Sequence, residues 1–282
     1  MDLTDEIKNN VRLALAEDIG ACDYTALLIA EEKKIIADVI CRDDAVLCGT
    51  HWFDACFQQL SSATLVRWYC KDGDVLSAGQ KICEVEGHAR ALLTAERTAL
   101  NFLQTLSATA TKTRCYVDRV SGTGAKIVDT RKTLPGLRLA QKYAVKCGGG
   151  VNHRLGLYDG ILIKENHVIA TGGIEQALHK ANAIAPSGVF IQVEVETMDE
   201  LRLALSAGAK MVLLDNFSLD QLRAAVILTQ QLVGKPTLLE ASGNISLKNV
   251  KAVAETGVDR ISIGSLTKDV MAVDLSMRFQ LF

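Results

Sequence analysis

The sequence predicts an α/β protein with two parts, a layered N-terminal domain and a C-terminal parallel α/β barrel that is shorter than a complete TIM-like barrel. Two patterns predict this. Up to residue 115 strand and helix patterns follow one another irregularly, and beyond it short apolar runs alternate with helical stretches. We place the N-terminal domain at residues 1–112 and the barrel at residues 113–269, and we expect the tail, residues 270–282, to return to the N-terminal domain.

In the N-terminal part, apolar residues at Ile7, Val11 and Leu15 have helical spacing and predict a helix over residues 4–17, with Thr4 as a possible N-cap. A long stretch from Ala89 to Val120 has no Gly or Pro and is rich in Ala, Leu and Thr, which predicts one helix or two. The apolar runs between these helices are bounded by turn residues and predict strands. The strands are Ile35–Arg42, Thr64–Lys71 and Lys81–Glu86.

The barrel part repeats one unit, a near-continuous apolar run followed by a helical stretch. The runs are Lys126–Thr130, Gly160–Lys164, Val189–Glu196, Met211–Asp215, Thr237–Ala241 and Arg260–Gly264. The helical stretches are Leu137–Cys147, Ile174–Ala185, Asp199–Ala207, Leu219–Val233 and Leu247–Thr256. Such strands indicate a parallel sheet buried on both faces, either open and doubly wound or closed. Polar residues at the ends of the runs favour a barrel, and about six units instead of eight favour an incomplete one.

The composition excludes several classes of protein. With 31 Lys+Arg against 33 Asp+Glu the net charge is −2, unlike that of a basic nucleic-acid binder. No apolar run approaches the roughly 18 residues that span a bilayer. The acidic, polar start lacks a secretory signal, so we expect a cytoplasmic protein. Its eight cysteines include no C-x-x-C pair, and we expect them to be free thiols.

Positive charge is concentrated between Lys126 and His167. This segment contains eight basic and three acidic residues, so its net charge is 8 − 3 = +5. The basic residues are Lys126, Arg131, Lys132, Arg138, Lys142, Lys146, Arg154 and Lys164. Lys142 and Lys146 lie one turn apart on a predicted helix, and we expect them on a solvated face. Arg131, Lys132 and Lys164 follow apolar strands instead and predict a site for anions.

Three further groups of residues belong to the expected site. Three glycines precede Val151-Asn152-His153-Arg154 and would let backbone N–H groups approach a ligand or a neighbouring chain. Glu194, Glu196 and Asp215 at strand ends suit Mg²⁺, sugar hydroxyls or ion pairs with the basic residues. The segments Ser242–Asn244 and Ile263–Ser265 follow the last two strands, where barrels commonly bind phosphate.

Three blocks of sequence resemble quinolinate phosphoribosyltransferases (nicotinate-nucleotide pyrophosphorylases, carboxylating). They are Asp129-Thr-Arg-Lys-Thr-Leu-Pro-Gly-Leu-Arg138, Lys142-Tyr-Ala-Val-Lys-Cys-Gly-Gly-Gly-Val-Asn-His-Arg-Leu-Gly156 and Leu162-Ile-Lys-Glu-Asn-His167. The resemblance continues in order through Val193–Glu196, Leu213–Asn216, Leu239–Gly243 and Ile261–Gly264, and upstream through Ala95–Asn101.

The resemblance implies an N-terminal α/β sandwich domain, a C-terminal open α/β barrel and a homodimer in which one subunit's sandwich caps the other's barrel. It implies a pentosyltransferase of de novo NAD synthesis. Quinolinate and phosphoribosyl pyrophosphate give nicotinate mononucleotide, CO₂ and pyrophosphate with the cofactor Mg²⁺.

The resemblance also implies a role for each site residue. Those near the quinolinate carboxylates are Arg131, His153, Arg154, Lys164 and, from the partner subunit, Arg97. Lys132 faces the pyrophosphate leaving group. Glu194 and Asp215 serve the ribose hydroxyls and Mg²⁺, largely through substrate and water. The 5′-phosphate residues are Ser242, Gly243, Asn244, Gly264 and Lys268. Many relatives have Gly in place of Asn244 and His in place of Lys268.

Two other functions remain open from the sequence. One is a related phosphoribosyltransferase that acts on nicotinate, although four cations (Arg97, Arg131, Arg154 and Lys164) exceed what one carboxylate needs. The other is a phosphate-binding barrel without catalysis, which would have no use for Lys132 at a leaving group.

Overall fold

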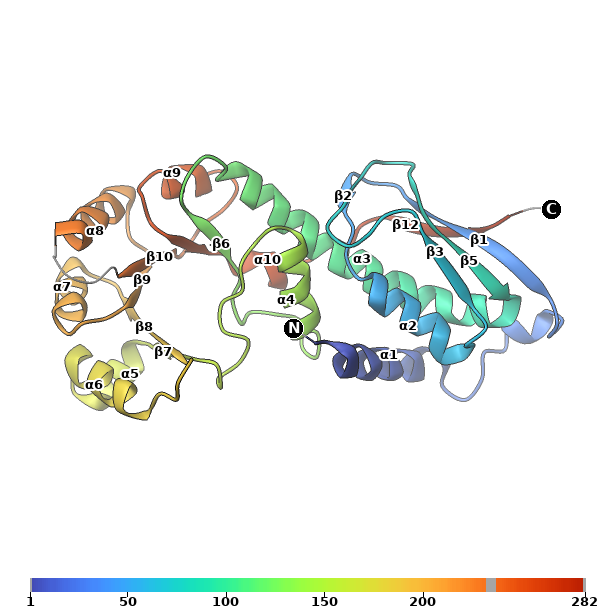
Figure 1. Cartoon of the computed structure of the whole chain (residues 1–282), viewed down its shortest axis with the longest axis horizontal. Coiled ribbons are helices and arrows are strands. Elements are labelled where there is room, and N and C mark those ends of the chain that lie inside the picture. The colour runs from blue at the N-terminus through green and yellow to red at the C-terminus, as the bar shows by residue number, and fades with distance from the viewer. Residues whose placement is uncertain (1, 232–236, 281–282) are drawn as a thin grey trace. The chain divides into compact units, whose positions relative to one another are not determined.

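The computed structural model describes residues 2–231 and 237–280 and divides into two compact units (Figure 1). The N-terminal unit comprises residues 1–114, 133–149 and 266–282, and the barrel unit comprises residues 115–132 and 150–265. No helix within the described ranges is both long and apolar enough to cross a membrane.

The N-terminal unit is built on a four-stranded antiparallel sheet in the order β12-β1-β5-β3. Its strands are β1 (Lys34–Cys41), β3 (Leu65–Trp68), β5 (Lys81–His88) and β12 (Leu275–Phe279). A separate pair joins β2 (Ala45–Val46) to β4 (Val75–Leu76). The pairing of β1 with β12, Ala37 opposite Phe279, puts this part of the C-terminal tail at the edge of the sheet.

Helices cover one face of this sheet, and the hydrophobic core lies between the helices and the sheet. The helical elements are α1 (Thr4–Ile19), the 3₁₀ turn η1 (Ala26–Leu28), α2 (Thr50–Leu60), α3 (Ala89–Arg119), α4 (Arg138–Cys147) and α10 (Ser265–Lys268), which starts at the boundary of the two units. Trp52 and Phe53 of α2 are fully buried with Val39 of β1 and Leu103 of α3. The long stretch after Ala89 is therefore one helix of 31 residues.

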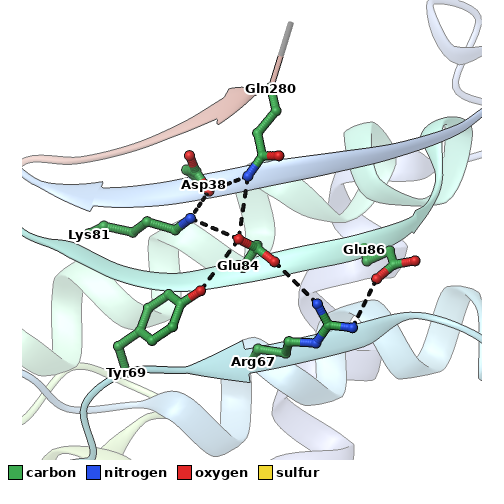
Figure 2. A network of polar contacts seen from close by, with 7 residues as sticks. All are labelled: Asp38, Arg67, Tyr69, Lys81, Glu84, Glu86 and Gln280. Carbon is green, nitrogen blue, oxygen red and sulfur yellow. Dashed lines mark hydrogen bonds and ion pairs between the residues drawn. The ribbon is translucent and has the colours of Figure 1, made fainter. Parts of the chain in front are cut away.

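The other face of the sheet is polar. Lys81 forms ion pairs with Asp38 and Glu84, and Arg67 forms ion pairs with Glu84 and Glu86. Figure 2 shows these side chains crossing three neighbouring strands, with Gln280 closing the network. One apolar and one polar face is the usual pattern of an antiparallel sheet packed on one side only.

The barrel unit contains six parallel strands in the order β6-β11-β10-β9-β8-β7. They are β6 (Lys126–Val128), β7 (Gly160–Ile163), β8 (Phe190–Val195), β9 (Met211–Asp215), β10 (Leu238–Ser242) and β11 (Arg260–Ser262). No ladder joins β6 to β7 in the part of the chain that the structure describes, so the barrel is open.

Helices α5 (Glu165–Thr171), α6 (Ile174–Ile184), α7 (Met198–Ser206), α8 (Leu219–Gln231) and α9 (Val250–Ala254) connect the strands. In Figure 1, α6 to α9 lie on the outer side of the sheet. The architecture confirms the predicted fold class, an α/β protein with a parallel C-terminal sheet.

Several local predictions are wrong. Leu3 is the N-cap of α1, and the Asp2 carboxylate accepts hydrogen bonds from the backbone and hydroxyl of Thr4. Helices α2 and α5 were not expected. Lys142 is completely buried rather than on a solvated face, although Lys146 is exposed as predicted. The predicted helix Leu219–Val233 is observed to Gln231, and its last two residues lie outside the described ranges.

Helix α4 follows the first barrel strand in sequence but packs in the N-terminal unit, where Ala140 and Ala144 join the buried cluster. The glycine that ends α4 explains part of this packing. A Cβ atom on Gly148 would lie 2.4 Å from the Ala110 carbonyl oxygen of α3. Only glycine allows the chain to pass so close to that helix.

Candidate active site at the carboxyl ends of the barrel strands

Most of the predicted site residues lie at one end of the parallel sheet, because each follows or ends a strand and parallel strands end on the same side. They are Arg131 and Lys132 beyond β6, Lys164 beyond β7, Glu194 in β8, Asp215 in β9, Ser242 in β10, Gly243 and Asn244 beyond it, and Gly264 beyond β11.

Two arginines share a partly buried region of this site. The Arg154 guanidinium donates to the Gly160 carbonyl oxygen at 3.1 Å. Its pKa is lowered, first by burial and then by the positive charge of Arg131. The Arg131 Nε atom is buried without a hydrogen-bond partner among the described residues. A buried donor beside a second cation is suited to an anionic ligand, which would satisfy the donor and offset both charges.

The backbone N–H and both ring nitrogens of His153 take part in hydrogen bonds. Its backbone N–H donates to Asp129 Oδ1 at 2.8 Å, and Nδ1 accepts from the Arg154 N–H at 2.7 Å. The neutral ring therefore carries its proton on Nε2, which donates to Gln192 Oε1 at 2.7 Å. This ring has a fixed tautomer and a fixed orientation.

A buried polar network inside the barrel supports His153 and was missed by sequence analysis. Glu240 Oε1 lies 3.7 Å from His153 Nε2, and Glu240 Oε2 accepts from Arg260 Nε at 2.9 Å. Gln192 and Glu240 are both almost completely buried. The sequence did contain a sign of this network, because Gln192 and Glu240 are polar residues within otherwise apolar strands (Phe-Ile-Gln-Val and Leu-Leu-Glu-Ala).

Lys164 and Glu194 are brought together from neighbouring strands. Lys164 Nζ lies 2.7 Å from Glu194 Oε2, with the lysine side chain 49% exposed and the glutamate 15% exposed. Lys164 is held at the strand–helix junction because its backbone N–H donates to His167 Nδ1 at 3.0 Å in the first turn of α5.

Glu196 is placed differently from Glu194. It lies past the end of β8, is exposed, and its backbone N–H donates to Glu200 Oε2 at 2.8 Å. Glu200 also completes the capping box of α7 with Thr197. Within the described contacts Glu196 takes part in the start of α7, whereas Glu194 pairs with a cation of the site.

The loops after β9 and β10 are joined to each other. The Asn216 backbone N–H donates to the Ser242 carbonyl oxygen at 2.9 Å, and the Asn244 amide donates to Asn216 Oδ1 at 3.4 Å. Asn216 and Asn244 have φ of 57° and 49°, and among the described residues they are the non-glycine positions with positive φ. A Cβ on Gly243 would lie 2.1 Å from Asn216 Oδ1.

Asn216 was not predicted as a site residue, although it follows Asp215 directly. It also donates to Asp215 Oδ2 at 2.9 Å. Asn216 therefore links the acid that ends β9 to the small-residue segment after β10. Its positive φ depends on these contacts, and nothing in the local sequence would show it.

Lys132 and Gly264 lie together at the ends of β6 and β11. A Cβ on Gly264 would lie 3.1 Å from Lys132 Cδ, so the lysine stem passes directly over the glycine. Arg97 is exposed on α3 and Lys268 is exposed at the end of α10. Both belong to the N-terminal unit and are not part of the cluster within the barrel unit.

Comparison with known proteins agrees with this arrangement. The chain matches the models of the quinolinate phosphoribosyl transferase N-terminal domain over residues 23–107 and C-terminal domain over residues 109–278. It is 42% identical to a probable nicotinate-nucleotide pyrophosphorylase [carboxylating] of Bacillus subtilis, covering 96% of this chain and 93% of that protein. It is 41% identical to the Mycobacterium leprae nicotinate-nucleotide pyrophosphorylase [carboxylating], covering 97% of both.

A solved structure is also similar. The nicotinate-nucleotide pyrophosphorylase from Francisella tularensis superposes with a TM-score of 0.95 at 45% identity, covering 99% of this chain and 98% of that one. The chain belongs to the quinolinate phosphoribosyltransferase family.

Proposed function

We propose that this protein is a quinolinate phosphoribosyltransferase (decarboxylating) of NAD biosynthesis. It transfers the phosphoribosyl group of phosphoribosyl pyrophosphate to quinolinate and releases CO₂ and pyrophosphate, leaving nicotinate mononucleotide. The names of the relatives support the reaction. The structural observation that supports this reaction at these residues is the pair Arg131 and Arg154. The two cations are neighbours, and the Arg131 Nε atom is a buried donor without a partner among the described residues.

Quinolinate carries two adjacent carboxylates, and the site has cations for both. Arg131 and Arg154 form one positive region, and Lys164 supplies a further ammonium group. Charge-assisted hydrogen bonds from these groups would fix the pyridine ring. His153 acts as a positioning residue, since its ring and backbone hold the bend that carries Arg154.

The phosphoribosyl end of the substrate fits the small residues after β10 and β11. Ser242, Gly243 and Asn244 form a turn that Asn216 holds, and Gly264 leaves space for the Lys132 stem. Backbone N–H groups in such a turn suit a 5′-phosphate. Lys132 is then the cation that faces pyrophosphate.

Mg²⁺ fits the acids of this site. Glu194 and Asp215 lie on adjacent strands and each has one carboxylate oxygen in a resolved hydrogen bond. Among the described residues the site holds no cluster of three metal-ligating side chains. This suits Mg²⁺, which is usually bound by one or two carboxylates together with water and substrate phosphates. When bound, it would neutralise charge on the leaving pyrophosphate.

The protein's own residues then act in order. Arg131, Arg154 and Lys164 orient quinolinate so that its ring nitrogen faces the ribose carbon. The Lys132 ammonium group stabilises negative charge on pyrophosphate as the bond breaks. The Glu194 and Asp215 carboxylates stabilise the positive sugar. The nitrogen attacks the ribose carbon and becomes a pyridinium. The positive ring stabilises the carbanion that forms when the neighbouring carboxylate leaves as CO₂, and that ring carbon then takes up a proton from water.

The family resemblance supports two finer proposals. The protein is a homodimer in which Arg97 of the partner subunit adds a further cation at the quinolinate carboxylates. It works in the cytoplasm, in line with a chain of eight free cysteines.

A coupled assay tests the function. The purified protein is given phosphoribosyl pyrophosphate, Mg²⁺ and either quinolinate or nicotinate, and both nicotinate mononucleotide and CO₂ are followed. Product with CO₂ from quinolinate alone is the expected result. Product from nicotinate but not quinolinate would contradict the role of the arginine pair. No product from either would favour a non-catalytic phosphate-binding protein.

A further inference from the structure

A second chemical cluster lies in the N-terminal unit and takes no part in the proposed reaction. Cys48, Asp72 and Cys147 place one sulfur, one carboxylate oxygen and one sulfur within 4.8 Å of one another. Cys48 precedes α2, Asp72 lies between β3 and β4, and Cys147 ends α4. Residues almost 100 positions apart in sequence therefore form a pair of neighbouring thiols.

Helix α3 contacts the backbone of Cys48 and of Gly148, the residue after Cys147. The Cys48 N–H donates to Ser107 Oγ at 3.0 Å, and the Ser107 hydroxyl donates back to the Cys48 carbonyl oxygen at 3.2 Å. Next to Cys147, Gly148 packs on the Ala110 carbonyl and accepts a hydrogen bond from Arg114 Nε at 3.1 Å. Both segments are thus attached to the same helix, which keeps the two thiols close to each other in the reduced protein.

Asp72 already accepts three hydrogen bonds from the protein, which makes it a poor ligand for a metal ion at this cluster. Its Oδ1 accepts from the N–H groups of Gly49 and Thr50 at the start of α2, each at 3.1 Å. Its Oδ2 accepts from the Tyr143 hydroxyl at 2.9 Å. A metal ion would have to share this carboxylate with those three donors, whereas a bond between the sulfurs needs nothing from Asp72.

The two thiols differ in a way that suits stepwise oxidation. The pKa of Cys147 is lowered, chiefly by its hydrogen bond with the neighbouring Cys48 thiol. The pKa of Cys48 is raised, chiefly by burial. Cys147 is half-buried and within reach of a small oxidant, whereas Cys48 is completely buried. Half-buried Cys70 is a natural comparison, because burial raises its pKa to about 11.

We propose that Cys48 and Cys147 form a dithiol pair that a hydroperoxide oxidises reversibly to an intramolecular disulfide. The Cys147 thiolate attacks the peroxide oxygen, which gives a sulfenic acid and releases hydroxide when hydrogen peroxide is the oxidant. The Cys48 sulfur then attacks the sulfenic sulfur, its proton leaves with the hydroxyl group as water, and the S–S bond forms. Two thiols and one peroxide give one disulfide and two waters.

The bond would join the end of α4 to the start of α2. Cys147 is followed directly by Gly148–Gly150 and then by His153 and Arg154, so the crosslink lies six and seven residues before two residues of the proposed active site. This chemistry does not depend on the proposed reaction, and its covalent product can be measured whether or not the protein is active.

The test uses the reduced full-length protein with a small excess of hydrogen peroxide, followed by alkylation and mass spectrometry. We expect the loss of two hydrogen masses, a fall from eight titratable thiols to six, and a crosslinked peptide pair containing Cys48 and Cys147. Dithiothreitol should restore all eight. Cys48→Ser should abolish the crosslink and leave Cys147 to oxidise further to the sulfinic acid. Cys147→Ser should abolish the crosslink and serves in place of Cys48→Ser if that variant does not fold.

The exposed cysteines provide the matched control, and the double variant Cys22→Ser with Cys115→Ser should form the crosslink as the wild type does. Three results would overturn the proposal. One is faster oxidation of Cys22, Cys115 or Cys70 than of Cys147. Another is a disulfide between other cysteines. The third is a stoichiometric thiophilic metal in the purified protein that is released only when Cys48 and Cys147 are alkylated.

Discussion

Lys164 Nζ and Glu194 Oε2 lie 2.7 Å apart across the ends of β7 and β8. The contact leaves the Lys164 ammonium group half-exposed and partly balances its positive charge. We therefore expect Lys164 to bind a second anion. Lys164→Met should therefore raise the KM for quinolinate by about tenfold, equivalent to about 1.4 kcal/mol, with a smaller change in kcat. Initial rates at saturating phosphoribosyl pyrophosphate measure this. Lys180→Met, an exposed lysine of α6, is the control. An unchanged KM would contradict the role of Lys164.

Lys132 should act on the leaving group and not on quinolinate. Lys132→Ala should lower kcat by roughly a hundredfold to a thousandfold, the usual loss when one donor to developing negative charge is removed. The Kd for quinolinate, measured by calorimetry, should stay nearly the same. Lys126→Ala provides the control because Lys126 is exposed at the opposite end of the same strand. Equal losses in turnover and in quinolinate binding would show that Lys132 serves another purpose.

Gly243 is required by the contact with Asn216. In Gly243→Ala the new methyl group would lie 2.1 Å from Asn216 Oδ1, at a residue whose φ is 97°. The turn after β10 must then move, and we expect the KM for phosphoribosyl pyrophosphate to rise at least tenfold while quinolinate binding changes little. Gly188→Ala carries the same backbone strain at φ 87° with no atom within 4 Å, and it should leave both constants near the wild-type values. Equal effects of the two variants would contradict this.

Gln192 should maintain the His153 tautomer. Gln192→Leu removes the oxygen that accepts from His153 Nε2–H at 2.7 Å, and the loss of this buried hydrogen bond should cost about 1–3 kcal/mol. We expect this loss in urea unfolding, together with a changed ¹⁵N shift of the His153 ring and a raised KM for quinolinate. Gln230→Leu on the exposed surface of α8 should change none of these. A loss of stability with an unchanged ring shift would limit Gln192 to a packing role.

Asn10 connects three parts of the N-terminal unit. Its amide donates to the Gly136 carbonyl oxygen at 3.2 Å, and its Oδ1 accepts from the buried Trp52 Nε1 at 3.1 Å. Asn10→Ala leaves the indole N–H unsatisfied and should lower the free energy of unfolding by about 1–3 kcal/mol. Chemical denaturation followed by tryptophan fluorescence measures this. The neighbouring Asn9 is exposed, so Asn9→Ala should lower stability by less than about 0.5 kcal/mol. Equal losses would show that the Trp52 contact is unimportant.

The alternation of strands and helices in the barrel could be predicted from the sequence alone. Near-continuous apolar runs such as Met211–Asp215 can bury both faces only in a covered parallel sheet, and this rule needs no knowledge of neighbours. The sequence also placed Arg131, Lys164, Glu194 and Asp215 on one rim, since parallel strands end on the same side. The pairing of Lys164 with Glu194 follows from the adjacency of β7 and β8, which only the fold supplies.

Features that depend on contacts between distant segments become visible only in the folded protein. The spacing of Lys142 suggested a solvated helix face, but helix α4 is covered on several sides and Lys142 is completely buried. Gln192 and Glu240 meet around His153 from separate strands, and Asn216 adopts a positive φ because it bonds to the loop after β10. Cys48 and Cys147 become neighbours because their segments pack together in the N-terminal unit, where Cys48 and Gly148 both bond to α3. Periodicity and local propensity describe residues a few positions apart, whereas these contacts join residues 28 to 99 positions apart and exist only after the chain has packed.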